Sequence, residues 1–210
     1  AGSSGFDGLL VIRPEDGIVE IHQGCGNLGT NSIPDTARAA ADVLGVEWDQ
    51  VEVVFGDTSR HLPWSSIQAG SQTTHAHTRA NHAVGLDAKQ KLQEIAARDL
   101  GGRPEDYETS DGRVYRSSNP SQGMTLARAA TRAIELGGRY SGEEFADNLN
   151  NMTKASVTAL AGRGLVAAAR DTFGSQGGLQ SWVVGFAEVA LDVETGKVDL
   201  VHFTATTDCG

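Results

Sequence analysis

Apolar and polar residues alternate most regularly near the end of the chain. Between Ser181 and Asp192, every second position from Trp182 to Ala190 points one way and the intervening residues point the other. A Glu-Thr-Gly-Lys sequence at 194–197 follows, and residues 198–207 again have strand composition. A period of two on either side of a Gly-containing turn predicts a long β-hairpin.

Shorter β-branched or apolar runs predict further strands. The Pro-Glu-Asp-Gly sequence at 14–17 predicts a turn that joins the first two of them into a hairpin. The expected strands are residues 8–13, 18–22, 51–55, 113–116 and 163–173.

Apolar residues at helical spacing predict three helices, over 33–44, from about 73 to 100, and 126–136. Ser32 with Asp35 three positions later resembles a capping box, and Thr125 is the expected N-cap of the third helix. A Gly or a Gly-Gly pair follows each helix and marks its end. Residues 139–162 are polar and weakly patterned, so we expect a surface excursion there.

Antiparallel hairpins mixed with amphipathic helices predict an α+β fold, in which mixed or antiparallel sheets are layered with helices. We expect two lobes. The first, residues 1–120, contains the Gly-rich loops, and the second, residues 121–210, ends in the long β-hairpin. No repeated βαβ series and no dinucleotide-binding Gly fingerprint is visible in the sequence.

Composition narrows the classes of function. The 210 residues carry a net charge of −10, which argues against a nucleic-acid partner. The sequence contains no apolar run of about 18 residues, so we expect no membrane span. Cys25 and Cys209 are expected to be free thiols or small buried residues, because two cysteines make no disulfide framework.

Two Gly-rich loops precede predicted helices, at 24–31 and 70–74. Gly lets a backbone approach a ligand closely, and a helix N-terminus offers N–H groups and partial positive charge to an anion. Hydroxyl and amide side chains in the second loop add polar contacts. A phosphate-bearing cofactor would suit these loops, although ordinary helix caps have the same composition.

Other chemistries have weaker signals. His75, His77 and His82 do not form a metal clamp on a helix, because positions two apart do not share a face and no ligand stands three or four residues from His75. A hydrolase would use Ser66 or Ser71 with one of these histidines, but the sequence has no Gly-x-Ser-x-Gly elbow. Asp57 and Asp208 are expected to be turn residues. We therefore assign no catalytic residue and no metal ligand to this chain.

Five stretches stand in one order along nearly the whole chain. They are residues 16–21 leading into the first Gly-rich loop, 39–46, 51–58 ending in Gly-Asp-Thr, 69–74, and 186–198 with a closing Asp-Cys-Gly at 208–210. Together they resemble the large, molybdopterin-binding subunit of the xanthine dehydrogenase and aldehyde oxidase family of molybdenum hydroxylases. The resemblance is weakest across residues 100–175.

The resemblance implies a molybdopterin cofactor with Mo, with a cytosine dinucleotide form as a bacterial variant. Its pterin and phosphate portions are expected to contact one set of residues from each loop. These are Gly29, Thr30 and Asn31 from the first loop, and Gly70, Ser71, Gln72, Thr73 and Thr74 from the second. Iron–sulfur clusters, with FAD as a further candidate, are expected in partner domains only, because two cysteines cannot hold such clusters.

The sequence departs from the family pattern at the first loop. Thr30 and Asn31 stand where Gln and Gly are usual, and histidines at 75 and 77 replace residues that are usually small. The family's catalytic glutamate is expected beyond the final hairpin, outside these 210 residues.

The resemblance therefore predicts the cofactor-binding part of an oxidoreductase that hydroxylates an aldehyde or N-heterocycle with water-derived oxygen. The isolated chain is expected to be inactive. Its partners would be the rest of the molybdenum subunit, an iron–sulfur subunit or domain, and a small-molecule substrate, in the cytoplasm or alternatively the periplasm. The alternative is a noncatalytic or degenerate assembly module, or a split subunit, of such a complex.

Overall fold

The computed structural model describes residues 5–171 and 182–207, and these separate into two compact units. The first unit is Ala1–Phe173 and the second is Gly174–Gly210. The sequence predicted a boundary after residue 120, but the main core contains residues from both sides of that position. Leu126, Ala129, Ala133 and Leu165 pack in it together with the strands and helices that precede residue 120.

A four-stranded sheet in the order β3-β2-β1-β7 forms the centre of the first unit. Its strands are β1 (Asp7–Ile12), β2 (Val19–His22), β3 (Val51–Val54) and β7 (Leu165–Arg170). Antiparallel pairing of β1 with β2 confirms the first predicted hairpin, and its turn is closed by the Gly17 N–H, which donates to the Arg13 carbonyl at 3.0 Å. β2 and β3 are parallel, with Glu20 opposite Glu52, so the helix between them forms a single βαβ crossover.

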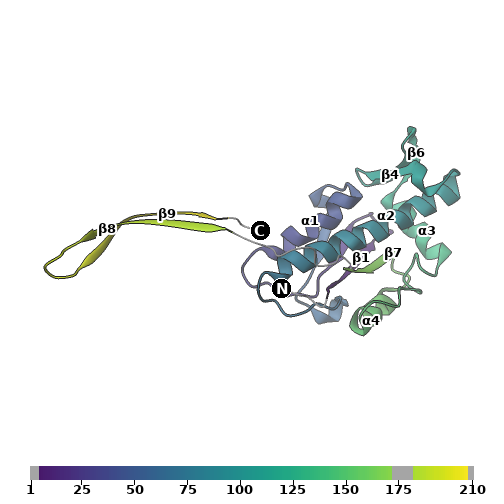
Figure 1. Cartoon of the computed structure of the whole chain (residues 1–210). Coiled ribbons are helices and arrows are strands. Elements are labelled where there is room, and N and C mark those ends of the chain that lie inside the picture. Colours follow the sequence, from purple (N-terminus) through teal and green to yellow (C-terminus); the bar gives the residue numbers. More distant parts are fainter. Residues whose placement is uncertain (1–4, 172–181, 208–210) are drawn as a thin grey trace. The chain divides into compact units, whose positions relative to one another are not determined.

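Helices α1 (Ser32–Leu44) and α2 (Thr78–Leu100) cover one face of this sheet (Figure 1). They run in the same direction, because Asn81 Nδ2 donates to the Thr36 carbonyl at 3.0 Å and Gly85 approaches Ala40 one turn further along both helices. Gly85 permits this approach, since a Cβ there would lie 3.1 Å from Ala40 Cα. The N-termini of both helices therefore lie at the same end of the sheet.

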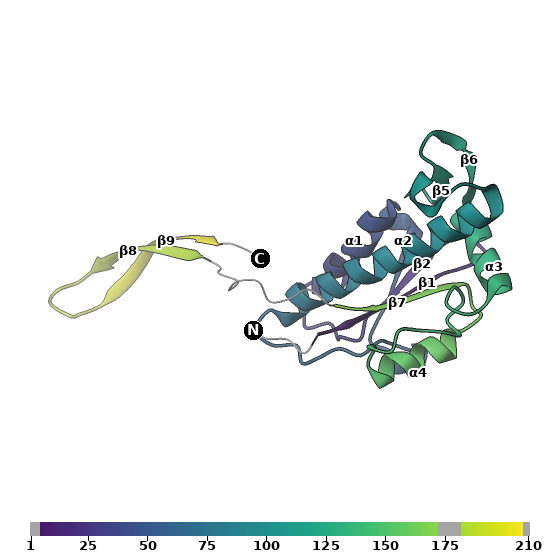
Figure 2. The ribbon, with the colours of Figure 1, turned by 45° about the vertical axis from the view of Figure 1, so that its right-hand side comes forward.

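Helix α4 (Asn151–Leu160) lies on the opposite face, as Figure 2 shows. Its Val157 and Leu160 pack against Leu9, Val11 and Val166 of the sheet. The sequence predicted only a surface excursion over 139–162, so that expectation was wrong for this helix. Asn150 caps α4 by accepting from the Met152 N–H at 2.9 Å.

Strand β7 is an edge strand whose outward backbone groups are bonded to side chains of α2. Lys91 Nζ donates to the Val166 carbonyl at 2.9 Å, and Asp87 accepts from the Ala168 N–H at 3.2 Å. Lys91 and Asp87 also form an ion pair at 2.8 Å. Burial lowers the pKa of the Lys91 ammonium, and Asp87 opposes that shift. This pair occupies the edge at which another strand would otherwise add.

A small antiparallel sheet and helix α3 (Leu126–Leu136) pack near the C-terminal end of α2. The sheet consists of β4 (Tyr107–Ser110), β5 (Arg113–Arg116) and β6 (Asn119–Thr125). Only β5 was predicted. Thr125 caps α3 as expected, accepting from the Arg128 N–H at 3.2 Å.

Short helical turns complete the first unit: η1 (Trp48–Gln50), η2 (Thr58–Arg60), η4 (Pro104–Asp106) and a π-helical turn, η3 (Thr73–His77), directly before α2. In the described part of the chain, no helix has the length and apolar character needed to cross a membrane.

The second unit is the predicted hairpin of β8 (Val183–Leu191) and β9 (Val198–Thr207). A bulge falls between Glu188 and Val189. Cross-strand pairing places Val189 opposite Leu200 and Leu191 opposite Val198, so one face of the hairpin is apolar. Ser181, Asp208 and Cys209, which also figured in the predictions, lie outside the described residues.

Candidate cofactor-binding site

The two predicted Gly-rich loops lie at the same end of the first unit. The loop 24–31 follows the carboxyl end of β2 and enters α1, and the loop 70–74 leads into α2 through the turn η3, which begins at Thr73. Because α1 and α2 are parallel neighbours, both loops lead into adjacent helix N-termini. Each N-terminus carries an effective charge of about +0.5, so the pair presents a combined positive potential to an anion.

The two helix starts at this end differ in their capping from the starts of α3 and α4. The N-caps of α1 and η3, Asn31 and Gln72, make no side-chain capping hydrogen bond. The N-caps of α3 and α4, Thr125 and Asn150, both do. The predicted capping box at Ser32 was wrong, because Ser32 is already in the helix and its hydroxyl contacts the Thr30 hydroxyl at 3.0 Å. The first-turn N–H groups of α1 therefore face outward without a side-chain acceptor.

Left-handed backbone conformations cluster in both loops. Gly29 and Gly70 have φ of 79° and 58°, and a Cβ at either position would meet no atom within 4 Å. Asn31 and Ser71 are not glycines, yet they have φ of 59° and 61°. Asn tolerates this region, whereas Ser does so less readily. Such strain is frequent at ligand sites and fixes the shape of the two loops.

The π-helical turn η3 starts at Thr73, inside the predicted second loop. π-Turns are rare and occur often at functional sites. Here the turn buries Thr73 and His77 while Thr74 stays exposed. The hydroxyl of Thr74 is thus the one of the two threonine hydroxyls that is accessible to a ligand.

Three contacts join the first loop to residues on either side of the second, Pro63 and Gln68 before it and His77 after it. Gln68 pairs with both backbone groups of Gly26, its Oε1 accepting at 3.0 Å and its Nε2 donating at 2.8 Å. Gly24 packs so closely on residue 63 that a Cβ would lie 2.0 Å from the Pro63 carbonyl oxygen. Between these glycines, Cys25 Sγ lies 3.0 Å from His77 Nδ1. The two loops are therefore held in a fixed relation.

Charged groups flank the second helix start. Arg79 donates to His75 Nε2 at 3.0 Å and forms an ion pair with Asp171 at 2.9 Å. Gln72 adds an uncharged acceptor, its side-chain amide oxygen, at the same helix start. Its Oε1 is buried, and no partner for it lies among the described residues.

The eight predicted site residues are thus brought to one end of the fold on two linked loops. Gly29, Thr30, Asn31, Gly70, Ser71 and Thr74 are exposed, Gln72 is half-buried and Thr73 is buried. Their contact with a cofactor stays a prediction. Sequence reasoning missed Gln68 and the Cys25–His77 contact, and the Gly on each side of Cys25 was the only signal for the latter.

Other interpretations of these side chains gain no support. His75 contacts Arg79 and His77 contacts Cys25, so the described partner of each ring is a residue other than Ser66 or Ser71. Asp57 accepts from the Ser59 N–H at 2.9 Å, which confirms its role in a turn. Across residues 5–171 and 182–207, no group of three or more His, Cys, Asp or Glu residues is arranged to hold a metal ion.

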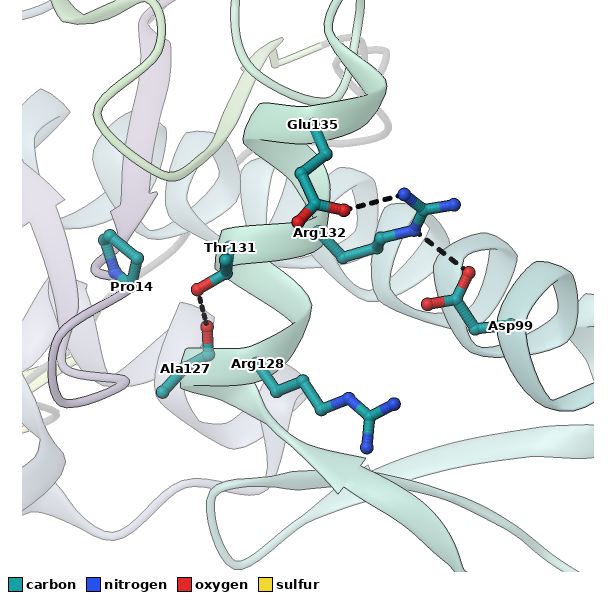
Figure 3. A pocket seen from close by; sticks show the side chains of 7 residues that line it. All are labelled: Pro14, Asp99, Ala127, Arg128, Thr131, Arg132 and Glu135. Carbon is teal, nitrogen blue, oxygen red and sulfur yellow. Dashed lines mark hydrogen bonds and ion pairs between the residues drawn. The ribbon is translucent and has the colours of Figure 1, made fainter.

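Two cavities are found near these elements, one away from both loops and one in contact with the first loop. One of about 520 Å³ lies between α3, the last turn of α2 and Pro14, and Figure 3 shows Arg132 bridging Asp99 and Glu135 at its side. It is at the C-terminal end of α2, away from the helix N-termini. Another, of about 370 Å³, is lined by Gly24 of the first loop, by Thr58 and residues 61–65, and by three residues of α4.

The sequence model of the molybdopterin cofactor-binding domain matches residues 3–210. The aldehyde oxidoreductase molybdenum-binding subunit PaoC of Escherichia coli (strain K12) is 31% identical over 137 residues, which are 65% of this chain and 17% of that subunit. A nicotinate dehydrogenase subunit of Pseudomonas putida is 31% identical over 121 residues, which are 58% of this chain and 10% of that subunit.

Solved structures share the fold. CO dehydrogenase from Oligotropha carboxidovorans has a TM-score of 0.70 at 22% identity, covering 98% of this chain and 22% of its own. Quinoline 2-oxidoreductase from Pseudomonas putida 86 has a TM-score of 0.65 at 20% identity, covering 100% of this chain and 24% of its own. The chain spans less than a quarter of each of these four proteins.

Proposed function

Because this chain belongs to the family of molybdopterin cofactor-binding domains, we propose that its loops 24–31 and 70–74 hold the pterin and phosphate portions of that cofactor. The observation that carries this assignment is the pair of parallel, adjacent helix N-termini whose N-caps make no side-chain bond. A phosphate at this end of the fold would accept from backbone N–H groups that the protein's own side chains leave available.

The residues at this end fit such a group. Open space above Gly29 and Gly70 lets a ligand approach the backbone, and the buried Gln72 Oε1 is an acceptor without a protein partner among the described residues. The exposed hydroxyls of Ser71 and Thr74 are donors as well as acceptors. We assign backbone contacts to Gly29, Thr30 and Asn31, and side-chain contacts to Ser71, Gln72 and Thr74. Molybdopterin bound there would supply a redox-active molybdenum centre.

For the whole enzyme we propose hydroxylation of an aldehyde or an N-heterocycle. The substrate carbon exchanges a hydrogen for a hydroxyl whose oxygen comes from water, and two electrons and two protons are released. The names of the relatives support this class, since one is an aldehyde oxidoreductase subunit and the other a nicotinate dehydrogenase subunit. The electrons would pass to iron–sulfur clusters, and where present FAD, in partner chains or domains.

Two finer proposals accompany this one. The cofactor is taken to be the cytosine dinucleotide form, because two adjacent helix starts offer more N–H groups than one phosphate needs. The protein is placed in the cytoplasm, with the periplasm as the alternative. We also propose that the 210-residue chain alone does not turn over aldehydes or purines, because it spans only 17% of the molybdenum-binding subunit PaoC.

A noncatalytic assembly module is the second candidate, and Thr30 is the observation that favours it. The family usually has Gln at this position, and Thr cannot reach as far or donate an amide N–H. Molybdenum analysis of the native assembly separates the two. An assembly that purifies without molybdenum would establish the scaffold function.

A charge reversal at Thr74 tests the cofactor site. Thr74→Glu puts a carboxylate at a helix N-terminus, which stabilises the helix but repels a phosphate. Molybdenum content of the native assembly should therefore fall sharply while its Tm is unchanged or higher. Thr74→Gln is the neutral control of the same size, and Thr158→Glu on the exposed side of α4 controls for added charge. Stoichiometric molybdenum in the Thr74→Glu assembly would refute the site.

A further inference from the structure

Cys25 and His77 form a buried contact between segments that are 52 positions apart in the sequence. Sγ lies 3.0 Å from Nδ1, and the exposed fractions of the two residues are 3% and 0%. Cys25 belongs to the loop that enters α1, and His77 is the last residue of the π-turn that enters α2. The contact therefore joins the two helix starts to which we assign the cofactor.

The neighbours of Cys25 leave the thiol little freedom. Gly24 is pressed against the Pro63 carbonyl, and Gly26 is held through both of its backbone groups by Gln68. The backbone on each side of Cys25 is thus fixed, and its side chain points at the imidazole. On the other side of the contact, the Phe6 ring packs edge-on against His77 with ring centroids 5.4 Å apart.

Both partners are neutral at ordinary pH. Burial raises the pKa of the Cys25 thiol to about 11 and lowers the pKa of the His77 imidazole to about 4. With both groups neutral, one hydrogen lies between Sγ and Nδ1, and the tautomer of His77 decides which of the two atoms donates it. A neutral thiol is a poor nucleophile and a poor metal ligand, so the pair is suited to holding structure rather than to chemistry.

Resting on the proposed function, we propose that Cys25 and His77 are positioning residues, and that their hydrogen bond sets the placement of the first cofactor loop relative to the π-turn. The bond fixes the spacing between two sets of backbone N–H groups that must contact one ligand together. Loss of the bond lets the loops move independently, so the ligand must supply the ordering free energy itself and binds less tightly.

Substitution of Cys25 in the native assembly tests this role. Cys25→Ala removes the hydrogen-bonding atom, whereas Cys25→Ser keeps a hydroxyl that can donate to His77 or accept from it. We expect cofactor to be lost about tenfold faster from the Ala variant than from wild type, the factor that a net hydrogen bond of ordinary strength gives. The Ser variant should recover most of the difference. The measurement is molybdenum retained by the assembly over time during gel filtration.

A purely structural role is excluded by a matched control. Val157→Ala removes a buried side chain from the separate core under α4, on the face of the sheet opposite α1 and α2. It should lower stability by a comparable amount and leave cofactor release unchanged. Equal release from the Val157→Ala and Cys25→Ala assemblies, or failure of Cys25→Ser to recover, overturns the proposal.

Coupling between the pair and the cofactor must also run in the reverse direction. Bound cofactor should also slow alkylation of Cys25, measured by peptide mass mapping, because a ligand that holds both loops keeps the thiol buried. Equal alkylation rates with and without cofactor would refute the coupling. If Thr74→Glu empties the assembly of molybdenum but these tests fail, only the positioning role falls. If Thr74→Glu keeps its molybdenum, the proposed site itself is wrong.

Discussion

Burial of a neutral histidine beside the two loops makes the stability of the first unit depend on pH. His77 is 0% exposed, and desolvation lowers the pKa of its imidazole from 6.5 to about 4. In the unfolded chain the ring protonates as the pH falls through 6.5, while in the folded chain it stays neutral until the pH approaches 4. Between these values the unfolded state binds more protons, so stability falls as the pH is lowered.

The size of this effect follows from the two pKa values. Each unit of difference is worth about 1.4 kcal/mol, and at pH 4.5 the free energy of unfolding should be about 2.5 kcal/mol below its value at pH 8 from this group alone. Above pH 6.5 the contribution of His77 is complete and constant. Cys25 makes the free energy of unfolding depend on pH in the alkaline range. Its thiol pKa, raised from 9.0 to about 11, makes stability fall as the pH rises above 9.

Urea unfolding of the chain between pH 4.5 and 8, followed by tryptophan fluorescence, measures this dependence. His77→Gln keeps an acceptor for the Cys25 thiol but cannot titrate, so its stability should vary with pH by about 2.5 kcal/mol less than that of wild type. His202→Gln on the exposed hairpin is the matched control and should keep the wild-type dependence. Parallel pH profiles for wild type and His77→Gln would refute the reasoning.

Further substitutions test particular features of the first unit by urea unfolding. Asn31→Gly should leave the free energy of unfolding nearly unchanged, whereas Asn31→Val should lower it by about 1–2 kcal/mol, because a β-branched residue is strained in the left-handed region. Equal effects of the two substitutions would contradict a left-handed conformation at Asn31. Gly24→Ala should cost about 1–3 kcal/mol or more because its Cβ would overlap a backbone carbonyl, whereas Gly26→Ala, whose nearest neighbour would be 3.7 Å away, should be tolerated. Asp87→Ala leaves the buried Lys91 unpaired and should cost about 3 kcal/mol, and the double variant Asp87→Ala with Lys91→Met should regain part of that loss.

Local patterns in the sequence were enough to predict most elements of the fold. The hairpin turn at 14–17, the helix that ends at Gly45, and the N-cap at Thr125 all depend on residues within a few positions of one another. The final hairpin is equally local, because its strands follow one another across a short turn. The α+β class followed from these elements without knowledge of how they pack.

Non-local features were beyond the same reasoning. β7 pairs with β1 across more than 150 positions, and α4 is a helix whose apolar face is specified by the sheet it covers. The pairing of β7 with β1 also decides where the chain divides into units. It brings residues that follow position 120 into the same core as residues that precede it. Within the candidate site, the loops were predictable as Gly-rich helix starts, but their linkage through Gln68 and through Cys25 and His77 spans 42 and 52 positions.

At Thr30 and Asn31 the sequence departs from the family pattern, and the structure shows how much each replacement changes the loop. In the sequence, both stand where the family usually has Gln and Gly. In the structure, Asn31 has φ of 59° and ψ of 13°, the conformation for which Gly is the usual residue and Asn the best substitute. The backbone course that Gly would serve is therefore kept. Only the side chain at Thr30 remains as an argument for lost function, because Thr cannot make the contact that the family's Gln makes. The loss of that one contact is a weaker argument than the two helix starts without side-chain caps, which three contacts hold together.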